Sequence, residues 1–242
     1  FLPTMLLNAN HSDANTREGA ICFFVFISPA FESKLEPFLG RIVPAVLQGL
    51  ADDSEGVREV AMRAGQAIIG QYGTTSVGML LPLLEGGLFN LNWRIRLSSV
   101  TLLGELLNKI TGVEHTDDAD QDDDDESMVD NSIENVKASA QILVNVLGTQ
   151  KHMDVLSALY LIRNDVVRAV QQQSLLVWKT AVHNTPATLR TILPALLQRI
   201  INSLGSPNED KRHVGSRTLG DLVGRLPGQI LPTIVPIIEK GI

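Results

Sequence analysis

The side chains of this sequence best suited by type and spacing to hold a metal ion lie in an acidic run at residues 112–132. Carboxylates alternate there as they do in a calcium-binding loop, at Asp118, Asp120 and Asp122. Such a loop needs glycine at its sixth position and glutamate at its twelfth, whereas this chain has Asp123 and Val129. We therefore expect a solvated loop of like charges and no metal site. A regulatory role for this loop, as an acidic site for a basic partner, is an alternative interpretation.

The other residue types that catalyse reactions are scattered along the chain. The five histidines and the single cysteine, Cys22, lack the spacing of a zinc site, and one cysteine excludes an internal disulfide. No glycine-rich loop ends in Gly-Lys-Ser or Gly-Lys-Thr, so a phosphate-binding loop is missing. Ser216 lacks the flanking glycine pattern of a hydrolase nucleophile. The sequence thus predicts a protein that is not an enzyme and has no cofactor and no small-molecule substrate.

The charge of the chain is unevenly distributed. The 242 residues carry a net charge of −7, yet residues 112–132 contain ten acidic residues and no Lys or Arg, which leaves +3 for the remainder. This remainder is too weakly basic for a dedicated nucleic-acid-binding protein, so we expect no sequence-specific nucleic acid partner. The basic residues that we expect to contact a macromolecular partner are Arg94, Lys211, Arg217 and Arg225.

The spacing of apolar residues predicts helices along nearly the whole chain. Apolar residues recur at three- and four-residue steps, as on one face of an amphipathic helix, for example at Leu103, Leu106, Leu107 and Ile110. The strict alternation of a half-buried strand is missing. The longest apolar stretch, residues 20–31, is too short to span a bilayer, and we expect no membrane partner. The predicted fold class is all-α.

Two markers recur along the chain with a period near forty residues. Prolines that follow an apolar residue are spaced by 41, 38, 112 and 38 residues, and an arginine recurs early in the partner helix. The prolines are Pro3, Pro44, Pro82, Pro194 and Pro232, and the arginines are Arg17, Arg58, Arg96, Arg168 and Arg212. Two helices per forty residues are typical of HEAT repeats, which stack into an α-α superhelix. We predict a single HEAT-repeat solenoid of about five helical hairpins across residues 1–242.

The two markers also place the repeat units. We predict units at residues 11–50, 51–88, 89–163, 164–204 and 205–242, with residues 1–7 ending a preceding unit. First helices are expected near residues 14–28, 54–72, 91–111, 165–183 and 207–226. Second helices are expected near residues 34–50, 75–88, 186–204 and 228–241. In the third unit the second helix follows the acidic loop and is expected in two parts, 133–147 and 151–163, interrupted at Gly148.

Single residues predict several helix ends and contacts. Ser206 and Thr185 are expected to cap the helices that follow them, and Gly73 is expected to end a helix in a left-handed turn. We interpret the recurring arginines as structural, each pairing with an acidic residue of the array. The pairs that fit are Asp53 with Arg58 and Asp165 with Arg168, and the residues expected to pack between units are Trp93 and Trp178.

Three stretches of the sequence resemble one family of HEAT proteins. They are residues 87–107 (GLFNLNWRIRLSSVTLLGELL), residues 177–186 with 192–194 (VWKTAVHNTP, ILP), and residues 217–223 with 230–238 (RTLGDLV, ILPTIVPII). These stretches resemble the Gcn-one family of translational activators, very long scaffolds of the general amino-acid control response. Their order and approximate spacing match along most of the chain, and the acidic loop falls where the family varies.

The resemblance implies a function that periodicity does not give. Proteins of this family bind stalled or collided ribosomes and recruit the Gcn-two kinase through its RWD domain. The kinase then phosphorylates the alpha subunit of initiation factor two. A more N-terminal region of such proteins carries the ATP-binding-cassette partner Gcn-twenty. We therefore expect a cytoplasmic, non-catalytic scaffold segment from the later part of a longer protein, with the ribosome and the kinase as partners.

The fold alone is also compatible with another class of protein. HEAT arrays serve as adaptors in other pathways, such as nuclear transport, and there the acidic loop would contact a small GTPase. Binding to a GTP-loaded transport GTPase would separate this alternative from the translational one.

Overall fold

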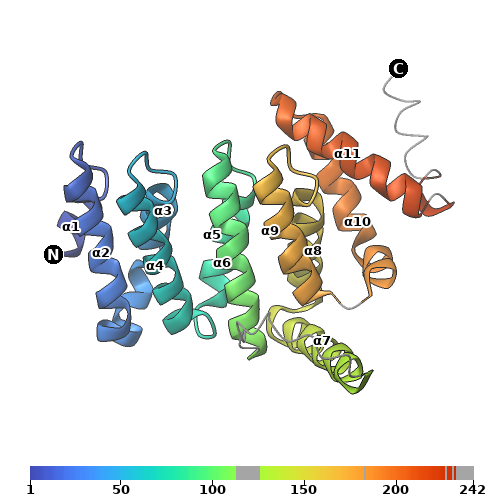
Figure 1. The fold of residues 1–242 in the computed structure, drawn as a ribbon, viewed down its shortest axis with the longest axis horizontal. Coiled ribbons are helices and arrows are strands. Elements are labelled where there is room, and N and C mark those ends of the chain that lie inside the picture. Colours follow the sequence, from blue (N-terminus) through green and yellow to red (C-terminus); the bar gives the residue numbers. More distant parts are fainter. Residues whose placement is uncertain (113–125, 183, 227, 231, 233–242) are drawn as a thin grey trace. The chain divides into compact units, whose positions relative to one another are not determined.

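All regular structure in the part of the chain that the structure describes is helical (Figure 1), which confirms the all-α fold class. The computed structural model describes residues 1–112, 126–182, 184–226, 228–230 and 232, and of residues 126–136 only the backbone. Contacts divide the chain into two compact units. Unit 1 comprises Phe1–His152 and Lys179–His183, and unit 2 comprises Met153–Trp178 and Asn184–Ile242.

Unit 1 is built from consecutive helical hairpins. Its helices are α1 (Leu2–Asn8), α2 (Ala14–Phe31), the 3-10 helix η1 (Glu32–Phe38), α3 (Leu39–Gly49), α4 (Glu55–Tyr72), α5 (Val77–Leu88), α6 (Trp93–Thr111) and α7 (Glu126–Leu147). The first helices of successive hairpins pack on one another, α2 on α4 and α4 on α6, and the second helix α3 packs on α5. This layered arrangement, visible in Figure 1, is the HEAT-repeat stack that the forty-residue period predicts.

Unit 2 contains most of two helices and the whole of two others. These are α8 (Thr149–Ile162), α9 (Arg168–Ala181), α10 (Thr185–Leu204) and α11 (Glu209–Arg225). Buried polar contacts join them: Ser174 on α9 donates to the Leu159 carbonyl on α8 at 2.9 Å, and Arg199 on α10 donates to the Ser157 hydroxyl at 2.8 Å. Helix α11 packs along α10.

The observed helices match the predicted ranges to within a few residues, with one clear correction. The predicted break at Gly148 is confirmed, because this glycine lies between α7 and α8 with a φ of 77°, in the left-handed region. The predicted acidic loop, residues 112–132, is wrong at its C-terminal end, since α7 already begins at Glu126. Its alternating carboxylates, Asp118 to Asp122, lie outside the described residues, as does most of the predicted helix 228–241.

Two predicted caps are wrong by one or two positions. The side chain of Asn208, not Ser206, caps α11 by accepting from the Lys211 amide at 2.9 Å, and Asn184, not Thr185, caps α10. In both turns a second polar residue that could act as the cap lies within two positions of the observed one, and the sequence does not show which of the two residues caps the helix. Ser206 instead accepts a hydrogen bond from the Asn208 amide at 3.2 Å.

Gly73 ends α4, but for a different reason from the predicted one. Its φ is −59°, an ordinary right-handed helical value, so no left-handed turn is present. A Cβ at this position would stand 2.5 Å from the Ile69 carbonyl oxygen and 3.0 Å from Cγ of Lys109 on α6. Glycine is therefore favoured mainly by the close approach of the Ile69 carbonyl in its own helix, with the side chain of Lys109 on α6 as a second, more adaptable neighbour.

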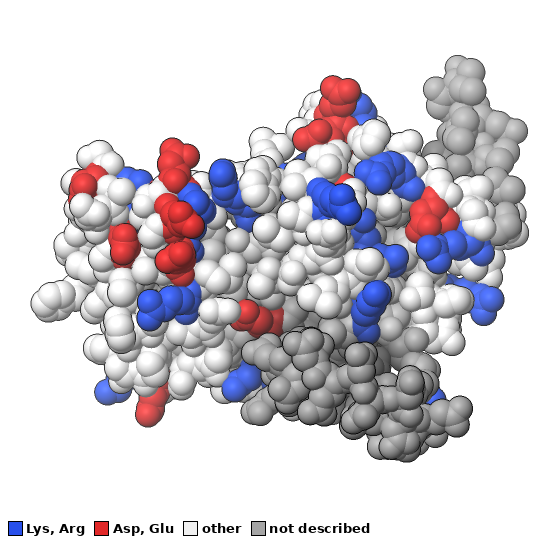
Figure 2. Space-filling model, viewed as in Figure 1, with Lys and Arg blue, Asp and Glu red and all other residues white. Residues whose placement is uncertain are grey.

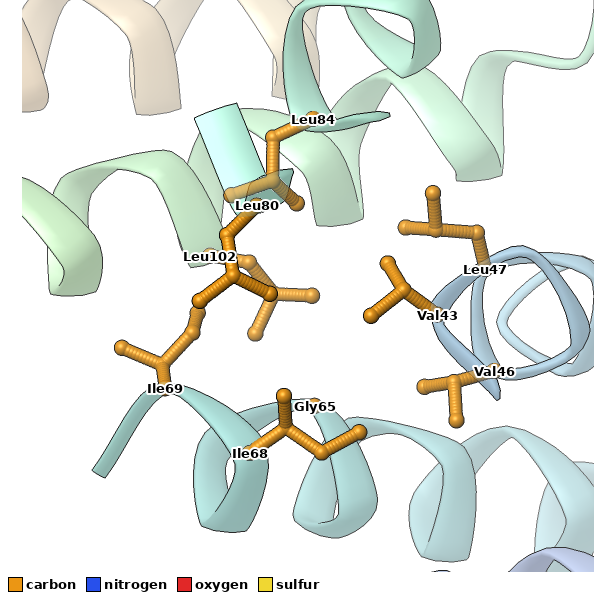
Figure 3. Close-up of a pocket in the computed structure, with 9 residues that line it drawn as sticks. All are labelled: Val43, Val46, Leu47, Gly65, Ile68, Ile69, Leu80, Leu84 and Leu102. Atoms are coloured by element: carbon orange, nitrogen blue, oxygen red, sulfur yellow. The ribbon is translucent and has the colours of Figure 1, made fainter. Parts of the chain in front are cut away.

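The core of unit 1 is continuous from one hairpin to the next. Figure 3 shows nine side chains and backbone positions of α3, α4, α5 and α6 that converge on one point. They are Val43, Val46, Leu47, Gly65, Ile68, Ile69, Leu80, Leu84 and Leu102. The space between them is about 10 Å³, and its wholly apolar lining offers a water molecule no hydrogen bond. This is core packing between repeats and not a ligand site.

Candidate functional site

The turns that precede the first helices share one hydrogen-bonding pattern. In each turn the backbone N–H of the last residue before the helix donates a hydrogen bond to a side chain two positions earlier. The accepting side chains are His11, Asp52, Asn90, Asp165 and Ser206. Four residues after the boundary, a side chain donates back to carbonyl groups of the turn. The donors are Arg17, Arg58, Arg96, Gln171 and Arg212. Four of the five recurring arginines are thus structural, as predicted, and they clamp the turns.

The way in which they act differs from the prediction. Arg58 contacts Asp53 through the backbone carbonyl at 2.8 Å and not through the carboxylate. In the fourth turn Gln171, rather than the predicted Arg168, donates to the turn, and Arg168 is the exposed first residue of α9. The long third unit separates this turn from the preceding ones, so the forty-residue period does not fix its register.

One ion pair links neighbouring repeats in unit 1. Arg17 on α2 makes a two-pronged contact with the carboxylate of Asp52, with Nε at 2.7 Å and Nη2 at 2.8 Å. The hydrogen bonds from Arg17 hold the pKa of Asp52 below its usual value, and burial partly opposes them. Such a pair between planar groups fixes geometry as well as energy, and here it sets one turn against the next.

The four predicted partner-contact residues are divided between the two units. Arg94 lies in unit 1 on α6, where its guanidinium carbon stands 5.0 Å from the ring centre of Trp93. Lys211, Arg217 and Arg225 lie on α11 in unit 2, with Arg217 and Arg225 exposed. Their role as partner contacts stays a prediction.

The two tryptophans differ in their surroundings. Trp178 is 2% exposed, which confirms its predicted packing role, whereas Trp93 is 39% exposed and therefore lies partly at the surface. An exposed tryptophan under an arginine is a common component of protein interfaces.

Unit 2 holds a polar hollow that the sequence analysis missed. Its lining comes from the segment after α8, from α9 and from α11, and its volume is about 230 Å³. The lining residues are Arg163, Asn164, Gln171, Gln172, Leu175, Asp221 and Arg225. Only Arg225 among them was singled out from the sequence, because the hollow depends on residues sixty positions apart meeting in space.

An arginine held between two aromatic rings forms the wall of this hollow. The guanidinium carbon of Arg163 stands 4.7 Å from the ring centre of Tyr160 and 5.3 Å from that of Trp178. The two rings meet edge to face with centres 5.2 Å apart. Both aromatic side chains are buried, so they orient the guanidinium and are not themselves a contact surface.

Asp221 connects the rings to the second arginine of the hollow. The hydroxyl of Tyr160 donates to Asp221, and Nε of Arg225 donates to the other carboxylate oxygen at 2.8 Å. Burial and the neighbouring carboxylate raise the pKa of Tyr160 well above its usual range, so the phenol stays protonated. Burial acts to raise the pKa of Asp221, but the hydrogen bonds from Tyr160 and Arg225 outweigh it and the pKa is lowered. The carboxylate is therefore ionised at neutral pH.

The hollow of unit 2 therefore presents fixed charges and hydrogen-bond donors, groups that are suited to binding a partner. No cluster of three or more potential metal ligands is found among the described residues. No helix in the described ranges is long and apolar enough to cross a membrane.

Comparisons with known proteins identify relatives of the whole chain. The family described as EF3 N-terminal HEAT repeat matches residues 6–111. The chain is 42% identical to the eIF-2-alpha kinase activator GCN1 of Dictyostelium discoideum over 238 residues, 98% of this chain and 9% of that protein. It is 42% identical to the stalled ribosome sensor GCN1 of Homo sapiens and 37% identical to the eIF-2-alpha kinase activator GCN1 of Saccharomyces cerevisiae, covering in each case 100% of this chain and 9% of the relative.

The chain thus spans about a tenth of the length of the curated relatives that it matches. The match extends from one end of the chain to the other, through the HEAT hairpins of unit 1 and the helices of unit 2. The predicted resemblance is therefore confirmed, and the chain is a homologue of one segment of the GCN1 proteins.

Proposed function

We propose that this chain is a non-catalytic scaffold segment of a ribosome-associated translational activator. In this role it promotes activation of the Gcn-two kinase and phosphorylation of initiation factor two alpha on amino-acid starvation. The observation that carries the proposal is the identity of about 40% over the whole chain to proteins named as kinase activators and ribosome sensors. A stack of HEAT hairpins supports it, because such an array presents a long surface with which to hold large partners.

The charge outside the acidic run, +3, is too weak to hold a ribosome alone and limits this segment to a contributory role in ribosome contact. Contacts of Lys and Arg with ribosomal RNA phosphates would add to those made elsewhere in the parent protein, and they would weaken with salt. The ribosome and the RWD domain of the Gcn-two kinase are the partners we propose, in the cytoplasm, with Gcn-twenty held by another region of the parent. The nuclear-transport alternative is not favoured, since the relatives that match the whole chain are GCN1 proteins.

The proposal is tested by exchanging the segment inside the full-length protein. In cells lacking the endogenous protein, one variant carries an unrelated HEAT array of the same length, and a control carries the matching segment of the human relative. We expect the control to restore phosphorylation of initiation factor two alpha on starvation and the unrelated array to fail. Full phosphorylation with the unrelated array, at equal protein abundance, would refute the proposed role.

A second measurement addresses the ribosome directly. Crosslinking mass spectrometry of the full-length protein on ribosomes should give adducts at lysines spread over the segment, namely Lys109, Lys151, Lys179 and Lys211. Adducts should fall as salt is raised. A complete lack of adducts from this segment to ribosomal proteins would contradict its part in ribosome contact.

A further inference from the structure

The polar hollow of unit 2 has the features of a built binding site. It is lined from three separate parts of the unit, and its volume of about 230 Å³ accommodates a side chain of a partner. Its lining is mainly polar, with two guanidinium groups, one carboxylate and three amides against one leucine. A gap left by imperfect core packing would be lined by apolar groups, as the small space between the hairpins of unit 1 is.

Arg163 lacks the partner that its position calls for. Within the described part of the chain its side chain makes no hydrogen bond or ion pair, and its Nη1 atom is buried without an acceptor. Burial lowers the pKa of Arg163, because it disfavours the charged guanidinium. Buried charged donors are normally paired, and an unpaired one in a native structure points to an absent ion or ligand.

The packing around Arg163 holds it ready for such a ligand. The rings of Tyr160 and Trp178 fix the plane of the guanidinium, so little conformational entropy is lost when an acceptor binds. Across the hollow, Arg225 is held by Asp221, which leaves Arg225 further donors, and its side chain is 49% exposed. Two oriented guanidinium groups therefore line one hollow.

The charge of the hollow favours a carboxylate over a phosphate. Arg163 and Arg225 contribute two positive charges and the ionised Asp221 one negative charge, so a single negative charge neutralises the site. A phosphate of charge near −2 would overcompensate it and would be repelled by Asp221. A planar carboxylate also matches the fork of a guanidinium.

The surroundings favour a protein partner over a nucleic acid. Leu175 lines the hollow and is 38% exposed, and Leu176 beside it is 53% exposed, so apolar contacts flank the polar ones. The rings of Tyr160 and Trp178 are buried and offer no face on which a base could stack. Apolar anchors beside a charged pocket are typical of peptide recognition.

Unit 2 also supplies the long-range attraction that an acidic partner needs. Its sequence contains nine Lys and Arg against six Asp and Glu, a net charge of +3. Residues 112–132 carry −10, so the rest of the chain carries +3. Because unit 2 alone carries +3, the rest of unit 1 is neutral. All of the net positive charge outside the acidic run is therefore in unit 2, and Figure 2 shows basic patches over the helices of this unit.

We propose that this hollow binds an acidic side chain, Asp or Glu, of a peptide segment in a protein partner. The carboxylate accepts hydrogen bonds from Arg163 and Arg225, and Leu175 and Leu176 contact neighbouring apolar residues of the peptide. The inference rests on the proposed scaffold function only in that a scaffold holds protein partners. Its test needs no ribosome and no kinase, so the two proposals fail separately.

The test uses the 242-residue chain and a fluorescein-labelled peptide, Gly-Ser-Leu-Glu-Leu-Glu-Ser-Gly, with a second peptide carrying Gln in place of both Glu residues. Binding is followed by anisotropy, and by the arginine Nε–Hε signals in ¹⁵N NMR spectra, in which R163Q identifies the signal of Arg163. We expect saturable binding of the Glu peptide that shifts this signal. The Gln peptide should bind at least tenfold more weakly.

Two variants of the hollow each have a matched control. R163Q should weaken binding of the Glu peptide at least tenfold, whereas R217Q, the same change at an exposed position of α11 outside the hollow, should leave it within twofold. Because R163Q also alters packing against the rings, Q172E places a repelling carboxylate at an exposed lining position instead. Q172E should weaken binding to a similar degree, and Q198E on α10 should not.

Several outcomes would overturn the inference. Equal binding of the Glu and Gln peptides would exclude a carboxylate site. A shift of the Arg163 signal by inorganic phosphate or by an eight-residue oligouridylate, without a shift by the Glu peptide, would assign the hollow to phosphate or RNA. Unchanged binding in both Q172E and R163Q would place the peptide elsewhere on the chain.

Discussion

The arginine that clamps the second turn provides a sharp test of the repeat architecture. Nη1 of Arg58 donates to the carbonyl of Asp52 at 2.7 Å and to that of Asp53 at 2.8 Å, so one cation closes the turn before α4. The variants R58A and R58Q both remove this charge. Glutamine keeps an amide group that can donate a hydrogen bond to the turn, whereas alanine keeps no donor. The fourth turn shows what glutamine does in this position, since Gln171 donates one bond to the carbonyl of Asp165.

The size of the effect follows from these two bonds. A hydrogen bond with a charged partner contributes about 1.5–3 kcal/mol when it is well protected. Arg58 is half-buried, and water replaces part of what its loss takes from the two carbonyls. We therefore assign about 1 kcal/mol to each bond, which predicts about 2 kcal/mol for R58A and about 1 kcal/mol for R58Q. For a chain of this size, R58A should lower Tm by about 4–8 °C.

The control is R63A, which removes the same charge from an exposed position of the same helix. Its effect should lie within about 0.5 kcal/mol of zero. Thermal unfolding by circular dichroism gives Tm, and hydrogen exchange over residues 50–60 reports the turn itself, with faster exchange expected in R58A. Equal stability of R58A and R63A would refute the clamp. Equal loss in R58A and R58Q would mean that charge, and not the hydrogen bonds, stabilises the turn.

Three further changes in unit 1 have defined outcomes. G87A should lower stability by about 1–3 kcal/mol in urea unfolding, because the new Cβ would stand 2.0 Å from a side-chain oxygen of α6, whereas G86A meets nothing within 4 Å and should be neutral or stabilising. Y72F removes a hydroxyl that donates to two backbone carbonyls at 2.9 and 2.6 Å and should cost about 1–2 kcal/mol in the same assay. D52N tests the ion pair with Arg17: since the pKa of Asp52 is lowered on folding, its stabilisation is present above the unfolded pKa of about 3.9 and is lost as pH falls through the folded pKa. D52N should thus be less stable than the wild type at pH 7 and equal to it in strong acid, and a constant difference at all pH values would contradict the ion pair.

The sequence predicts the helices well because their causes are local. Apolar spacing, proline position and capping residues all act within one turn of the helix that they define, so α2, α4 and α6 appear at the expected positions. The predictions fail at helix ends, where the geometry of the whole turn decides. Gly73 keeps a right-handed φ beside the carbonyl of Ile69, and the cap of α11 is Asn208 and not Ser206.

The hollow of unit 2 could not be predicted from such local patterns, because it is formed by residues from separate helices. Arg163, Tyr160, Trp178 and Asp221 come from three helices and the segment between two of them, and each residue taken alone is typical of a core or a surface position. Arginine in particular has two roles here that its spacing does not separate. Nη1 of Arg58 donates to carbonyls of its own turn, whereas the side chain of Arg163, half-buried against two rings, makes no hydrogen bond within the described part of the chain. Whether an arginine is used by its own turn depends on the positions of its neighbours, which its spacing in the sequence does not give.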